Sequence, residues 1–184
     1  MTGMIFGLVL LIVAGCIFLY NRFIRLDNMV REAWSGVDVQ LKRRYDLIPN
    51  LVTLVKGYMK HEKETLTTLT KLRGEAMTRT SPAEKEGVEN RLVDTLKTVF
   101  VVAESYPKLL SDTQFISLQH TLTEIEDTLQ VSRRYYNATV RNYNIAIHSF
   151  PGNLLAKMTH LVDKEYFEIT ASEAQNVEVK FHEK

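Results

Sequence analysis

The sequence predicts an all-α protein with a single N-terminal transmembrane helix, an up-and-down antiparallel four-helix bundle and an extended C-terminal tail. Three observations support this prediction. The chain begins with a long apolar run that has no charged side chain. Apolar residues then recur at intervals of three and four, which places them on one face of a helix. Breaks that contain proline separate these stretches. We therefore divide the chain into an anchor (1–20), a helical bundle (21–152), and a short helix with an extended tail (153–184).

The apolar run has the length of a membrane span. Residues 1–19 carry no charged side chain, and as a helix they cover about 28 Å, close to the ~30 Å hydrocarbon thickness of a bilayer. Tyr20 is expected at interface depth. A cleaved signal peptide is disfavoured because no Lys or Arg precedes Arg22. Val13–Cys16 matches a short lipidation box, but the run stays apolar beyond Cys16. The sequence favours the transmembrane helix, with lipidation of Cys16 as the alternative.

Positive charge is concentrated in the first third of the chain. Residues 1–60 hold eight Lys/Arg and four Asp/Glu, a net charge of +4, whereas residues 61–184 have a net charge of −3. Because positive residues beside a span stay in the cytoplasm, we expect the N-terminus outside and the helical domain on the cytoplasmic side of the inner membrane. Five cations form a candidate membrane-proximal basic patch that binds lipid headgroups or a partner's acids: Arg22, Arg25, Lys42, Arg43 and Arg44. A solvated helix face is the alternative interpretation of these charges.

The apolar periodicity predicts two helices directly after the span. The first covers residues 21–45. The second runs to residue 79, with Asp46 as its N-cap and Pro49 in its first turn. We expect a turn or a strong kink near Asp46, because an unbroken helix over residues 21–79 would be about 90 Å long and no later segment could cover it. A hairpin and one kinked helix both remain open.

Two further helices follow, and each has its own start signal. The third runs from Pro82 to about Ser105, with Ser81 as its cap. The fourth begins after Ser111 or Asp112 and ends near residue 150. Its first turns show the alternating three-four spacing of bundles and coiled coils, at Phe115, Leu118, Leu122, Ile125 and Leu129. Residues 154–162 are expected to form a short helix. The remaining tail is expected to be extended, with its aromatic side chains packed on the bundle or on a neighbouring chain.

The sequence offers no constellation of catalytic or metal-binding residues. His61-Glu62 begins like a zinc-protease motif, but the position of the required second histidine holds Thr65. Bundle di-metal sites use an acidic residue three positions before each histidine. No such residue precedes His61, His120, His148 or His160. The single cysteine excludes an intramolecular disulfide. We therefore expect no enzymatic activity, no metal and no cofactor.

Nucleic-acid binding is also disfavoured. Arginines and tyrosines alternate over residues 133–143, a pattern that can stack on single-stranded RNA. Tyr136 and Tyr143, however, fall on the apolar stripe of the fourth predicted helix, whereas stacking needs an open platform. The net charge of +1 provides no global attraction for a polyanion. We expect no nucleic-acid partner.

Two long motifs resemble those of the LemA family. The first, YNRFIRLDNMVREAWSGVDVQLKRRYDLIPNLVTLVKGYMKHE, covers residues 20–62. The second runs from Arg133-Arg134-Tyr135-Tyr136-Asn137 through Tyr143-Asn144 to Phe150-Pro151. The resemblance implies one N-terminal membrane helix and an up-and-down four-helix bundle, and it transfers no catalytic residues. Some family members are linked to membrane zinc metalloproteases of the heat-shock type. A relative in magnetotactic bacteria is implicated in shaping the magnetosome membrane.

These observations predict a non-enzymatic, membrane-anchored scaffold that binds membrane lipids, self-associates as a homo-oligomer, and shapes or stabilises the membrane. The alternative is an adaptor or regulator of a membrane zinc metalloprotease in envelope protein quality control. An unrecognised enzyme is the third hypothesis. A deep polar pocket with convergent carboxylates would support that hypothesis.

Overall fold

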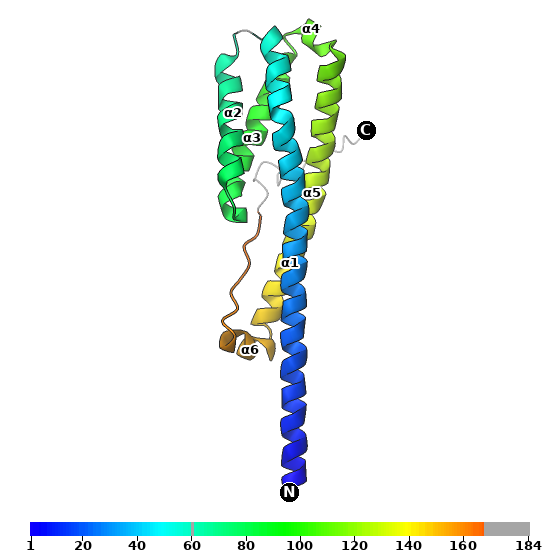
Figure 1. Ribbon diagram of the computed structural model, residues 1–184, viewed down its shortest axis with the longest axis vertical. Coiled ribbons are helices and arrows are strands. Elements are labelled where there is room, and N and C mark those ends of the chain that lie inside the picture. Colours follow the sequence, from blue (N-terminus) through cyan, green and yellow to red (C-terminus); the bar gives the residue numbers. More distant parts are fainter. Residues whose placement is uncertain (60, 168–184) are drawn as a thin grey trace, which may run out of the picture.

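The computed structural model describes residues 1–59 and 61–167, which contain six helices and no strand. The helices are α1 (Thr2–Tyr58), α2 (Lys63–Thr78), α3 (Pro82–Ala103), α4 (Pro107–Leu110), α5 (Thr113–His148) and α6 (Gly152–Met158). In Figure 1 the chain ascends in α1, descends in α2, ascends in α3, turns through α4 and descends in α5. The predicted all-α class and the up-and-down order of the bundle helices are confirmed.

The predicted start signals of α3 and α5 are present in the structure. The Ser81 hydroxyl accepts a hydrogen bond from the backbone N–H of Glu84 at 3.2 Å, and the Glu84 carboxylate accepts one from the backbone N–H of Ser81. This reciprocal capping box satisfies two N–H groups that have no partner inside the helix. The Asp112 carboxylate caps α5 by accepting from the N–H groups of Gln114 and Phe115 at 2.8 and 3.3 Å.

The expected turn or kink near Asp46 is wrong, because α1 is one helix of 57 residues that contains Pro49 in its interior. Proline has no N–H for the carbonyl four residues earlier, which belongs to Tyr45. The Arg73 Nε of α2 donates to that carbonyl at 2.7 Å and replaces the missing helical bond. The direction of the chain changes instead between Tyr58, the last residue of α1, and Lys63, the first residue of α2.

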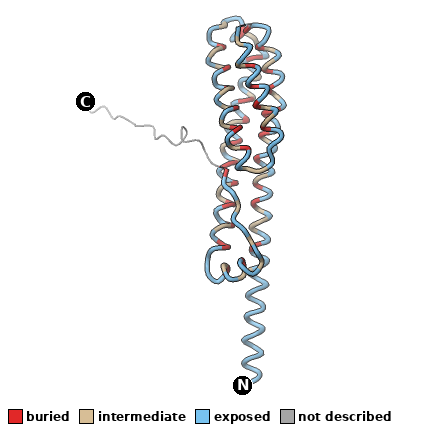
Figure 2. The backbone as a smooth tube through the Cα atoms, turned by 90° about the vertical axis from the view of Figure 1, so that its left-hand side faces the viewer, coloured by how far each residue is buried: buried red, intermediate tan, exposed pale blue. Residues whose placement is uncertain are grey.

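The interior of the bundle is filled by apolar side chains from all four long helices. In α1 most of the buried residues recur at intervals of three or four, and α2, α3 and α5 face them with their own stripes. Figure 2 shows these buried positions along the inner side of each helix. Residues that are fully buried include Val37, Leu41, Leu51, Val55, Leu69, Leu92, Val99, Leu129 and Val140.

The lower half of the domain has fewer helices than the upper half. There α1 is accompanied by the C-terminal half of α5, by α6 and by residues 159–167, which run back up the domain without regular structure (Figure 1). The predicted short helix at residues 154–162 is observed as α6, which begins two residues earlier and ends four residues earlier. Phe167 packs on the bundle, as expected for a tail aromatic, with 0% of its surface exposed. The rest of the predicted extended tail, residues 168–184, lies outside the described residues.

The N-terminal part of α1 extends beyond the domain. Among the described residues, α1 is the one helix long and apolar enough to cross a membrane, and none of its apolar window is buried inside the chain. The first buried residue of α1 is Phe23. The span therefore contributes nothing to the core, and the same helix enters the bundle without a linker.

Candidate functional site

The bundle interior contains a group of four charged side chains and one tyrosine, which we name the central ionic cluster: Arg44 and Tyr45 of α1, Glu89 of α3, and Glu126 and Arg133 of α5. The Arg44 guanidinium donates through Nη1 to Glu126 at 2.8 Å and through Nη2 to Glu89. The Tyr45 hydroxyl also donates to Glu89. Arg44 and Glu89 are 1% and 0% exposed, so their charges balance each other away from solvent.

Burial perturbs the proton equilibria of this cluster. Burial lowers the pKa of Arg44, and the nearby charge of Glu126 opposes that effect. Burial raises the pKa of Tyr45 to about 12, so its hydroxyl keeps its proton at neutral pH. Arg44 and Glu89 are enclosed and offer no surface to a substrate, and only the Glu126 carboxylate is partly exposed. The arrangement is suited to holding three helices in one register.

The five cations of the predicted basic patch do not come together. Arg22 and Arg25 are exposed beside the span. Lys42 and Arg43 are exposed, but they follow Tyr20 by more than twenty residues, about 33 Å along α1. Arg44 is buried in the central ionic cluster, so its assignment to a membrane-proximal patch is wrong. The sequence contains a signal for this burial, because Arg44 continues the three-four spacing of the core residues Val37, Leu41, Ile48 and Leu51.

A second feature that the sequence analysis missed is a pair of asparagines that hold the segment after α6. The Asn137 side chain donates to the Phe167 carbonyl and accepts from the Phe167 N–H, both at 2.9 Å. Asn144 makes the same pair of bonds with Lys164, at 3.0 and 2.9 Å. The two asparagines are seven residues apart on α5, which is about 10.5 Å along the helix. Lys164 and Phe167 are three residues apart in an extended segment, which is about 10 Å. The two distances match, so both asparagines reach the backbone of the segment. We name these two side chains the asparagine clamp.

The clamp places an aromatic side chain at the base of the four-helix part. The Phe167 ring lies 5.5 Å from the ring of Trp34, which lies 5.2 Å from the ring of Tyr136. The Arg133 guanidinium lies 4.5 Å from the Phe167 ring centroid, a cation–π distance. Tyr136 also donates from its hydroxyl to the Glu165 carbonyl at 2.8 Å. The segment after α6 is thus part of the folded core.

Lys164 also connects this segment to α1. Its Nζ lies 2.7 Å from Asp27, which is 2.8 Å from Arg31 on the other carboxylate oxygen. Burial by itself raises the pKa of Asp27, but the hydrogen bonds and charges of Lys164 and Arg31 hold the pKa below its ordinary value. Asp27 is therefore ionised at neutral pH and links the segment to α1.

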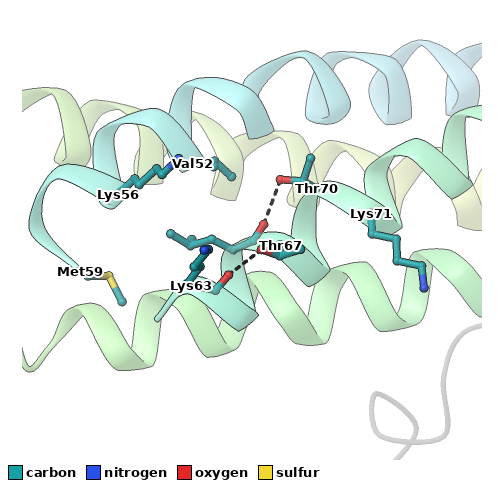
Figure 3. Close-up of a pocket in the computed structure, with 8 residues that line it drawn as sticks. Val52, Lys56, Met59, Lys63, Thr67, Thr70 and Lys71 are labelled. Carbon is teal, nitrogen blue, oxygen red and sulfur yellow. Dashed lines mark hydrogen bonds between the residues drawn. The ribbon is translucent and has the colours of Figure 1, made fainter. Parts of the chain in front are cut away.

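The end of the domain farthest from the N-terminus has an apolar groove between α1 and α2 (Figure 1). Its volume is about 560 Å³, and its floor includes Val52, Met59 and Leu66. Lys56, Lys63 and Lys71 surround it, as Figure 3 shows for the labelled side chains. The hydroxyls of Thr67 and Thr70 donate to the carbonyls of Lys63 and Leu66 at 2.7 and 2.9 Å, so they are already satisfied. The groove suits an apolar segment that carries negative charge.

Within residues 1–59 and 61–167, no group of three His, Cys, Asp or Glu side chains is close enough to hold a metal ion. The free Cys16 lies exposed in the apolar part of α1. The described fold and its sites are those of a membrane-associated helical-bundle protein with a long apolar first helix.

Comparison with known proteins identifies the family. The model of the LemA family matches residues 33–181, so the chain belongs to the LemA family, as the two motifs predicted. It is 26% identical over 163 residues to Protein LemA of Metamycoplasma hominis, covering 86% of this chain and 72% of the relative. It is 25% identical over 182 residues to Magnetosome protein MamQ 2 of Paramagnetospirillum magneticum, covering 85% and 67%. Magnetosome protein MamQ of Magnetospirillum gryphiswaldense is 23% identical, covering 80% and 64%.

Proposed function

We propose that the protein is a non-enzymatic, membrane-anchored scaffold whose helical domain self-associates at the membrane and thereby shapes or stabilises it. The observation that carries this proposal is the continuity of α1 from the apolar span into the bundle core. A helix transmits orientation, whereas a flexible linker does not. A domain held at a set angle to the bilayer can add neighbours in a regular lateral arrangement. The relatives named as magnetosome proteins are consistent with a role at a membrane.

Reconstitution tests this proposal. Full-length protein in vesicles that contain phosphatidylglycerol is expected to form oligomers, counted by single-molecule photobleaching, and to change vesicle shape in electron micrographs. The matched control carries a short Gly-Ser linker after Tyr20, which leaves both the span and the bundle intact. This variant is expected to lose the effect on vesicle shape. Strictly monomeric protein at every surface density, with unchanged vesicles, would contradict the proposal.

For the topology, we propose that the N-terminus lies outside and the helical domain lies in the cytoplasm of a cell with an inner membrane. Arg22 and Arg25, which follow the span, support this orientation and contact lipid headgroups. Ser111 is exposed between α4 and α5, at the far end of the domain. In a Cys16→Ser background, Ser111→Cys is expected to resist a membrane-impermeant maleimide until the cells are opened. Labelling in intact cells would contradict this topology, because it would place the helical domain outside.

A second candidate function is the adaptor or regulator of a membrane zinc metalloprotease. The lysine-surrounded groove between α1 and α2 favours it, because this groove lies about 48 Å along α1 from Tyr20, at the free end of the domain. An acidic, apolar segment of a protease or of its substrate fits such a groove.

Pull-down with a purified membrane protease of this class tests the adaptor. Reversal of charge at Lys56, Lys63 and Lys71 is expected to weaken capture several-fold. The control reverses Lys97 and Lys108, which are exposed on α3 and α4. Equal capture by both variants would contradict a role for the groove.

A further inference from the structure

The lower end of the helical domain carries a cluster of large apolar side chains that no described residue covers. Phe150, Leu154, Met158 and Val162 have 80%, 57%, 78% and 71% of their surface exposed. They lie in the turn after α5, in α6 and in the segment that follows it. Single exposed apolar residues are ordinary, but four within thirteen residues are a local concentration of exposed apolar surface at one end of the domain. We name these four residues the foot.

The position of the foot along α1 is set by a tight contact. Phe23 follows Tyr20 by three residues, about 4.5 Å along the helix axis. A Cβ atom on Gly152, the first residue of α6, would lie 3.0 Å from Phe23 Cζ and 2.7 Å from the Ala146 carbonyl oxygen. Only glycine permits this approach. The start of α6 is therefore held at the level where the apolar span ends.

The direction of α6 also places the foot at the end of the domain where the apolar part of α1 begins. Figures 1 and 2 show α6 lying across the direction of α1 at the lowest point of the domain, with only the N-terminal part of α1 below it. Gly152 and Ala156 are buried against the domain. Residues two positions apart on a helix point about 200° from each other. Leu154 and Met158 consequently lie on the side of α6 that does not pack on the bundle.

The charges around the foot match an anionic surface. No Asp or Glu occurs from residue 142 to residue 162, and Asp163, which follows Val162, lies 2.7 Å from His148. Lys157 is exposed on α6, and Arg22 and Arg25 are exposed on α1 at the same end of the domain. Apolar side chains flanked by cations are typical of segments that lie in the interface between headgroups and acyl chains.

We propose that α6 and its two flanking turns insert the foot into the headgroup–acyl boundary of the leaflet on the domain's side of the bilayer. This inference rests on the membrane anchoring in the proposed function. The domain is then attached at two points, α1 and the foot, which prevents rotation about α1. The foot adds volume to one leaflet only, so each molecule acts as a wedge.

Spin labelling of the full chain tests the inference. In a Cys16→Ser background, nitroxide labels are placed by Leu154→Cys, by Met158→Cys, and by Val131→Cys as the matched control. Leu154 and Val131 are equally exposed, at 57%, but Val131 lies on α5 well above the foot. The protein is reconstituted at one copy per nanodisc containing phosphatidylglycerol. The ratio of oxygen to nickel-chelate accessibility is expected to be several-fold higher for the L154C and M158C labels than for the V131C label.

A label on Cys16 in the parent protein separates the possible failures. If the Cys16 label lies in lipid while the L154C and M158C labels behave like the V131C label, the foot is overturned and the anchor stands. If the Cys16 label lies in water, the anchor and the foot are both overturned. If the L154C label is protected only when two copies share a disc, a second copy covers the patch and the inference is overturned.

Discussion

Arg44 connects three helices through one guanidinium. A charge in the bundle interior is costly unless it is paired, and here Glu126 of α5 and Glu89 of α3 both pair with Arg44 of α1. An apolar residue at this position would tolerate several registers of the three helices. The ion pair is satisfied only when all three helices present the right residue at the same level. Arg44 is thus a residue that selects one alignment of the bundle.

Removal of one partner in this pair is expected to be costly. Glu89→Gln leaves the Arg44 charge buried with less compensation, and we expect the free energy of unfolding to fall by about 3–5 kcal/mol. Urea unfolding in detergent, followed by circular dichroism, measures this loss. Glu124→Gln, on the exposed face of α5, is the control and is expected to change it by less than about 0.5 kcal/mol. The double variant Arg44→Met/Glu89→Leu is expected to recover most of the loss. A double variant as unstable as Glu89→Gln would contradict this account.

Two buried tyrosines predict a loss of stability at alkaline pH. The pKa values of Tyr45 and Tyr136 are raised from 10.0 to about 12, in both cases mainly by burial. Between these values the unfolded chain has lost the phenolic protons that the folded chain retains. Stability should therefore be complete below pH 10 and decline as the pH rises toward 12. Denaturant midpoints across this range measure the decline.

The control for this pH dependence is the double variant Tyr45→Phe/Tyr136→Phe. It loses the hydrogen bonds to Glu89 and to the Glu165 carbonyl, so its stability at neutral pH should be lower. Its decline between pH 10 and 12 should nevertheless be shallower than that of the parent protein. If the stability of this variant declined as steeply as that of the parent protein, titratable groups other than Tyr45 and Tyr136 would cause the loss.

At the scale of elements, α1 stays continuous because α2 supplies the donor that Pro49 removes. The Arg73 side chain reaches from α2 to the Tyr45 carbonyl at 2.7 Å. An interior proline otherwise kinks or breaks a helix at a cost of about 3 kcal/mol. The bond joins α1 to α2 and also keeps the domain in line with the apolar span.

A double-mutant cycle measures this compensation. Arg73→Met is expected to lower the free energy of unfolding by about 1–3 kcal/mol, because it leaves a carbonyl without its partner. In a Pro49→Ala background the backbone N–H of residue 49 can bond that carbonyl, and the same replacement should cost clearly less. Equal costs in the two backgrounds would show that Arg73 and Pro49 are not coupled. Chemical denaturation of the four proteins supplies the values.

The asparagine clamp predicts a fluorescence change at the only tryptophan in the chain. Asn137→Ala removes both hydrogen bonds to the Phe167 backbone, so the Phe167 ring should leave its contact with Trp34. Water then reaches the indole, and the emission maximum should shift to longer wavelength. Asn142→Ala, at an exposed position on the same helix, is the control. Unchanged emission in the Asn137 variant would mean that the clamp does not hold Phe167.

At the scale of the whole molecule, the span and the domain share a helix but not a core. No residue before Phe23 is buried, and the apolar window of α1 makes no internal contact that excludes solvent. The domain should therefore fold independently of the anchor. Removal of residues 1–19 is expected to change its free energy of unfolding by less than about 0.5 kcal/mol. A loss several times larger in the same detergent would show that the anchor supports the bundle.

Local sequence patterns predicted only part of the candidate site. Cysteine, histidine and glycine spacing predicted no metal or phosphate site, and this stays a prediction. The three-four spacing places Arg44 on the core stripe, but the usual exposure of arginine favours the surface, so residue type and periodicity give opposite predictions here. The asparagine clamp forms only because residues 159–167 run back along α5. No local sequence pattern predicts that path.

The sequence by itself determined the long apolar N-terminal helix, the all-α class and the starts of α3 and α5. These features depend on neighbouring residues, through continuous hydrophobicity, helical periodicity and capping bonds. Only the tertiary structure decided that α1 runs through Pro49, that Arg44 is buried, and that α6 lies at the end of the span. Each of those outcomes requires a partner distant in sequence: Arg73 for Tyr45, Glu89 for Arg44, and Phe23 for Gly152.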